Sequence, residues 1–121
     1  MEHLPALQFT ESARRLGAAS RAAGLTVPGF RCPPRVAGAV RTIRRYPGGT
    51  VISVSLRGRP FEQVVADMVE GVLLANRVEP PRAGALRAVL RDAIADIGDI
   101  GDIGDVGDVA SEKSREVARA A

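Results

Sequence analysis

The sequence predicts a small α+β domain in which a two-stranded antiparallel hairpin packs against helices. Two neighbouring patterns within residues 41–76 predict it. Apolar residues first alternate with serines, which is typical of a half-buried strand, and then recur at helical spacing. We expect the element order α-β-β-α-α.

Length limits the chain to one domain, because 121 residues are too few for two ordinary cores. We expect a flexible leader over residues 1–8, the α+β domain over residues 9–97 and a disordered acidic tail over residues 98–121. The folded part is then only about 85–90 residues, a size at which a core is marginal unless a partner completes it.

The first expected helix covers Phe9 to Ala23, with Thr10 as its N-cap and Gly24 just beyond its end. Its core-facing residues are expected to include Phe9, Ala13 and Leu16. Residues 25–38 follow, and because they hold three prolines we expect an extended, polyproline-like connection there.

The hairpin is expected to turn at Gly48-Gly49, because a two-residue type I′ turn needs positive φ at both central positions. This register sets Arg45 opposite Ile52 and Ile43 opposite Val54. The inner face then holds the apolar residues Ile43, Ile52, Val54 and Leu56. The outer face holds Thr42, Arg44, Tyr46, Ser53, Ser55 and Arg57.

The central helix is expected to begin at Pro60, because proline suits the first helical position, and to end before Pro80-Pro81. One stripe is apolar at helical spacing: Phe61, Val64, Val65, Met68, Val69 and Val72. We expect the opposite face to be solvated; it carries Glu62, Gln63, Asp67 and Glu70. A third helix shows the same spacing in Leu86, Val89, Leu90, Ala93, Ile94 and Ile97.

The tail opens with the triplet repeat IGDIGDIGDVGDV over residues 97–109. Its four glycines would cost about 4 kcal/mol in helical propensity relative to alanine, so we expect no stable helix there. Calcium binding through Asp99, Asp102, Asp105 and Asp108 is the alternative. EF-hand loops need a bidentate Glu and calcium-binding β-rolls a nine-residue period, so we predict no metal site.

Candidate catalytic groups are sparse. Cys32 lies between Arg31 and Arg35, which would favour a thiolate, but a half-buried packing residue is the favoured interpretation. Asp67 and Glu70 form an i, i+3 carboxylate pair that we expect to be solvated. No phosphate-cradling glycine motif is present, so we predict neither enzyme activity nor a cofactor.

The N-terminus lacks a basic segment followed by an apolar one, and no apolar run approaches the length of a membrane span. Only one cysteine is present, which excludes a disulfide framework within the chain. We therefore expect a cytoplasmic protein that makes no membrane contact.

Charge is uneven along the chain. Residues 1–60 carry ten arginines against two acids, a net +8, whereas residues 61–121 carry seven cations against twelve acids, a net −5. A basic segment favours an anionic partner, and β-ribbons can contact nucleic acid. The residues expected to contact nucleic acid or another anion are Arg41, Arg44, Arg45, Tyr46, Arg57 and Arg59.

Association with another protein is the first expected function. A lone hairpin exposes unpaired backbone groups at both edges, and the central helix carries more apolar surface than one hairpin covers. We therefore expect a non-catalytic assembly module that forms a homodimer or binds a protein partner. The expected surface comprises Ile43, Val54, Leu73, Leu74 and Val78. Binding of a nucleic-acid backbone by the arginine-rich hairpin is the alternative.

Overall fold

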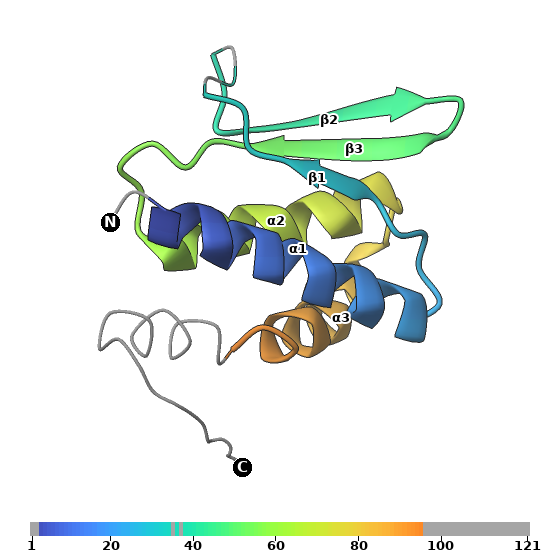
Figure 1. The fold of residues 1–121 in the computed structure, drawn as a ribbon. Coiled ribbons are helices and arrows are strands. Elements are labelled where there is room, and N and C mark those ends of the chain that lie inside the picture. Colours follow the sequence, from blue (N-terminus) through green and yellow to red (C-terminus); the bar gives the residue numbers. More distant parts are fainter. Residues whose placement is uncertain (1–2, 35, 37, 96–121) are drawn as a thin grey trace.

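The computed structural model describes residues 3–34, 36 and 38–95, in which three helices lie on one side of a three-stranded mixed sheet (Figure 1). The small α+β class expected from the sequence is confirmed. The elements in chain order are α1 (His3–Ala22), β1 (Gly29–Arg31), β2 (Arg41–Tyr46), β3 (Gly49–Val54), α2 (Phe61–Ala75) and α3 (Pro80–Asp92).

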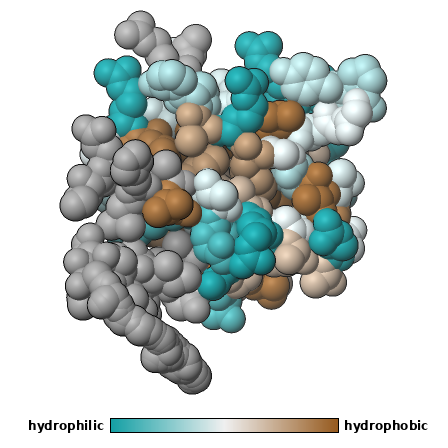
Figure 2. All heavy atoms as spheres, viewed as in Figure 1, coloured by the Kyte–Doolittle hydropathy of each residue, from teal (hydrophilic) through white to brown (hydrophobic). Residues whose placement is uncertain are grey.

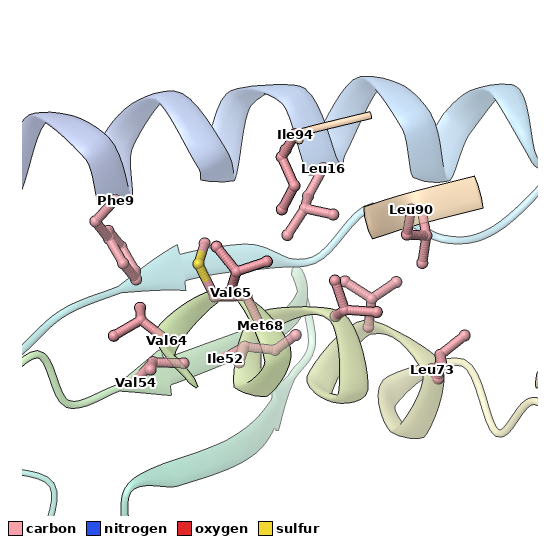
Figure 3. Close-up of a cluster of buried hydrophobic side chains, with 12 residues drawn as sticks. Phe9, Leu16, Ile52, Val54, Val64, Val65, Met68, Leu73, Leu90 and Ile94 are labelled. Carbon is pink, nitrogen blue, oxygen red and sulfur yellow. The ribbon is translucent and has the colours of Figure 1, made fainter. Parts of the chain in front are cut away.

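The elements form three layers. The helices α1 and α2 lie directly against the sheet, and α3 packs on their far side (Figure 1). The core fills the space between these layers, and its side chains come from all three helices and from β3 (Figure 3). The fully buried large residues include Leu16, Ile52, Met68, Leu90 and Ile94.

The sheet has three strands, so the expected two-stranded hairpin is incomplete. The additional strand, β1, pairs in parallel with β3, and the strand order is β1-β3-β2. It lies within residues 25–38, for which we expected an unpaired extended connection. Only three residues pair, Gly29 to Arg31, and so short a stretch offers no alternation from which a strand could be predicted.

The hairpin register differs from expectation by two residues. Ile43 lies opposite Ile52 and Arg45 opposite Thr50, and the turn residues are Pro47 and Gly48. Proline is favoured at the first central position of a type I turn, and only Gly49 of the two adjacent glycines has positive φ, at 142°. A shift of two keeps every strand side chain on its expected face.

The first helix begins earlier than expected. Residues 3–8, predicted to be a leader, form the start of α1, which spans His3–Ala22. Phe9 and Leu16 are buried as expected, and Ala13 packs beside them. The predicted tail, residues 98–121, lies outside the described residues.

The apolar stripe of α2 is confirmed. Its buried residues include Val64, Val65, Met68, Val69 and Val72, and the helix faces both β2 and β3. In α3 the pattern holds only in part, because Val89 is 53% exposed although Leu90 is buried. No helix in the described part of the chain is long and apolar enough to cross a membrane.

Glu70 pairs with an arginine of α3, which contradicts the expected solvated carboxylate. Arg87 donates from Nε and Nη2 to its two oxygens, the latter at 3.2 Å from Oε1. This hydrogen-bonded guanidinium lowers the pKa of Glu70 below its ordinary value. The pair therefore connects α2 to α3 in its charged form.

Acid should weaken this connection. Because the pKa of Glu70 is lower in the folded state, its stabilisation is present above the unfolded pKa and is lost as pH falls through the folded one. The pair is partly exposed, so we expect a loss of only about 0.2–1 kcal/mol. Urea unfolding at pH 7 and pH 3 measures this loss. Glu70→Gln should reduce the difference in the free energy of unfolding between the two pH values.

The matched control is Glu62→Gln, which removes an exposed carboxylate from the first turn of the same helix, outside the Glu70–Arg87 pair. If both variants reduce the difference in unfolding free energy between pH 7 and pH 3 equally, the Glu70–Arg87 pair makes no specific contribution to stability.

Candidate functional site

One face of the sheet carries no helix in the described part of the chain (Figure 1). We call it the bare face. The register places cross-strand rows on it: Arg31, Ser53 and Thr42 form one, and Gly29, Val51 and Arg44 the next. Tyr46 and Gly49 follow at the hairpin end. Hydrophilic side chains lie over the strands in the space-filling view (Figure 2).

The segment that forms the sheet is free of acidic residues. No Asp or Glu occurs between Glu11 and Glu62, although ten arginines do. Every acidic residue in the described ranges belongs to a helix or, for Glu79, to the N-cap of α3. The helical layers therefore hold the negative charge and the sheet layer holds only positive charge.

Two of the six predicted contact residues face α2 and pair with Asp67. Arg59 donates to the Asp67 carboxylate and also to the carbonyl oxygens of Ser55 at 2.8 Å and Gln63 at 3.2 Å. Arg41 lies with Nη1 at 3.6 Å from Oδ1 of Asp67. Asp67 is only 19% exposed, so the expectation that it would be solvated is wrong.

Arg45 also turns towards α2, where its Nη1 donates to the carbonyl oxygen of Ala75 at 3.1 Å. Arg41 and Arg45 are four residues apart in β2, so their side chains lie on the same face of the sheet, the one that α2 covers. Ala75 is the last residue of α2, and a cation at the C-terminal end of a helix complements the helix dipole. These two arginines and Arg59 thus connect the sheet layer to α2.

The other three predicted contact residues are exposed, as Arg45 is, but they do not turn towards α2. Arg44 and Tyr46 lie on the bare face, and Arg57 lies in the turn between β3 and α2. The structure adds Arg31 of β1, which is exposed on the same face of the sheet as Arg44 and which sequence reasoning missed because it missed the strand. Comparisons with protein-family models, curated proteins and solved structures found no match for this chain. The interpretation of this face therefore rests on its own geometry.

The five residues predicted for association are mostly covered within one chain. Val54 and Leu73 are buried, and Ile43 and Val78 pack against the core. Only Leu74 is well exposed, at 51%. The additional packing comes from α1 and α3, whose contribution the helical pattern of α2 alone did not reveal.

The outer edge of β2 has no partner strand in the described ranges. A hydrogen bond from the Ser55 N–H to the Val40 carbonyl oxygen continues the antiparallel ladder between β2 and β3. By alternation, the N–H and C=O groups of Arg41, Ile43 and Arg45 point away from β3. This edge therefore offers backbone donors and acceptors beside arginine side chains.

The candidate catalytic and metal groups are not assembled into a site within the described ranges. Cys32 is exposed, which contradicts the favoured half-buried packing role. No three His, Cys, Asp or Glu side chains of the described residues lie together so that they could hold a metal ion. The aspartates of the triplet repeat lie outside that part of the chain. Guanidinium donors on the bare face are suited instead to binding phosphate oxygens.

Proposed function

We propose that this domain is a non-catalytic interaction module that binds the phosphate backbone of nucleic acid on the bare face. The observation that carries the proposal is the placement of Arg31 and Arg44 on a sheet face where, among the described residues, no helix lies and no acidic side chain occurs. The backbone carries the affinity of most nucleic-acid binding, and it is recognised by such cations.

Geometry favours an extended ligand over a single ion. Arg31 and Arg44 lie on the two outer strands with β3 between them, so their backbones are about 10 Å apart by strand spacing alone. Arg57 extends the charge beyond β3. A polymer with regularly spaced phosphates can contact all three arginines at once.

Self-association is the second candidate, and the unpaired edge of β2 favours it. Two β2 strands that paired edge to edge would, however, bring six arginines together, because each strand reads RTIRRY. Like charges opposite one another destabilise a strand pair. Arginine on an edge strand instead resists pairing between copies, so we rank the homodimer below nucleic-acid binding.

Arg31→Ala/Arg44→Ala is expected to weaken binding of the full chain to a labelled 20-nucleotide single strand. Each phosphate contact contributes about 0.7 to the magnitude of the negative slope of log K against log salt. Loss of two contacts should therefore reduce that magnitude by about 1.4. Fluorescence anisotropy at 50, 100 and 200 mM salt measures both quantities.

The control is Arg82→Ala. This exposed arginine lies in α3, the layer farthest from the sheet. Its substitution removes the same kind of charge as the substitutions on the bare face. It should leave the salt slope unchanged. Equal weakening by a double variant of α3, Arg82→Ala/Arg91→Ala, would show that only overall charge matters and would overturn the assignment to the bare face.

A further inference from the structure

A hollow of about 240 Å³ lies at the hairpin end of the bare face. We call it the hairpin hollow. It is lined by Val27, Gly29, Tyr46, Thr50, Val51 and the adjacent glycines Gly48 and Gly49. Ligand pockets for drug-sized molecules occupy about 300–1,000 Å³, so this hollow suits one planar ring and no larger ligand.

The missing side chain of Gly29 helps to form the hollow. Gly29 lies beside Val51 in the sheet, and a Cβ added there would lie 3.7 Å from Cγ2 of Val51, an ordinary contact. Its φ does not lie in the left-handed region, unlike that of Gly49. The backbone therefore does not require glycine at position 29, and a larger residue would fit only by filling the hollow.

Tyr46 supplies an aromatic surface at the hollow and is 50% exposed. Arg44 lies two residues earlier on the same face of β2, directly opposite Val51 of the hollow. An aromatic ring with a neighbouring guanidinium is the combination by which proteins hold a base and its phosphate. Val27 and Val51 add apolar surface against which a base can pack.

We propose that the hairpin hollow takes one unpaired base of single-stranded nucleic acid, stacked on Tyr46, with the adjoining phosphate at Arg44. This inference rests on the proposed function. It adds a preference for single strands, because the bases of a duplex are already stacked inside the helix. Loss of the stacking surface should weaken single-strand binding about tenfold or more.

Tyr46 provides its own readout, because it is the only tyrosine and the chain has no tryptophan. We expect oligo(dT) of 20 nucleotides to quench tyrosine emission of the full chain, in step with the anisotropy of the same strand. A duplex of equal length should bind through the arginines and leave the emission unchanged.

Gly29→Leu fills the hollow and should abolish quenching while the salt slope of binding stays as in the wild type. If circular dichroism shows that this variant does not fold, Tyr46→Ala tests the same site by anisotropy. It should lose the preference for single strand over duplex, and Tyr46→Phe should keep it.

The two proposals fail in different ways. Salt-dependent binding without quenching of Tyr46, or with equal quenching in Gly29→Leu, would overturn the base site and leave the backbone interface intact. Absence of binding to any strand at 50 mM salt would overturn both.

Discussion

Gly71→Val is expected to destabilise the domain by about 3 kcal/mol, because it inserts a branched side chain where α2 packs against Ile52 of β3. A Cβ at Gly71 would lie 2.9 Å from Cγ2 and 3.0 Å from Cδ1 of Ile52. Ile52 is fully buried and β-branched, so it cannot turn aside. The expected fall in melting temperature is on the order of 15 °C.

Gly84→Val is the matched control. It makes the same change in α3, where a Cβ would meet nothing within 4 Å. Its effect should stay within about 0.5 kcal/mol. Thermal unfolding followed by circular dichroism compares the two. Equal stability of both variants would show that α2 does not rest against Ile52 as described.

Asp67→Asn is expected to destabilise the domain by about 2 kcal/mol, below the 3–5 kcal/mol of a fully buried pair because the site is partly exposed. The substitution keeps the size of the side chain but removes the negative charge that Arg59 and Arg41 share. Arg59 is only 15% exposed, so water compensates it poorly. Urea unfolding at pH 7 measures the loss.

Asp92→Asn provides the comparison, since Asp92 is an exposed aspartate at the end of α3. It should change the free energy of unfolding by less than about 0.5 kcal/mol. A loss in Asp67→Asn no larger than this would mean that the three charged groups are solvated, as the sequence alone had suggested.

Helical and strand periodicity predicted which residues face the core. The stripe from Val64 to Val72 is buried, and Ile43 and Ile52 face α2 although the register shifted by two. Periodicity specifies a face but not the element that covers it. It therefore could not show that Arg59 and Arg41 approach Asp67, or that Arg87 of α3 reaches Glu70.

The candidate interface could be predicted only in part for the same reason. Alternation placed Arg44 and Tyr46 on the outer face and Arg45 on the inner one, but it could not show that Arg45 reaches the Ala75 carbonyl of α2. Arg31 joined the bare face through a parallel pairing of three residues. Such a pairing depends on where the chain returns after α1, and no local pattern in the sequence reports it.

The most direct test of the nucleic-acid proposal is size-exclusion chromatography with light scattering on the full chain mixed with one equivalent of a 20-nucleotide single strand. With no tryptophan and one tyrosine, the protein absorbs weakly, so absorbance at 260 nm reports the strand. We predict co-elution at 50 mM salt and separation at 500 mM salt. Separate elution at 50 mM salt, or a protein dimer at both salts that carries no strand, would contradict the proposal.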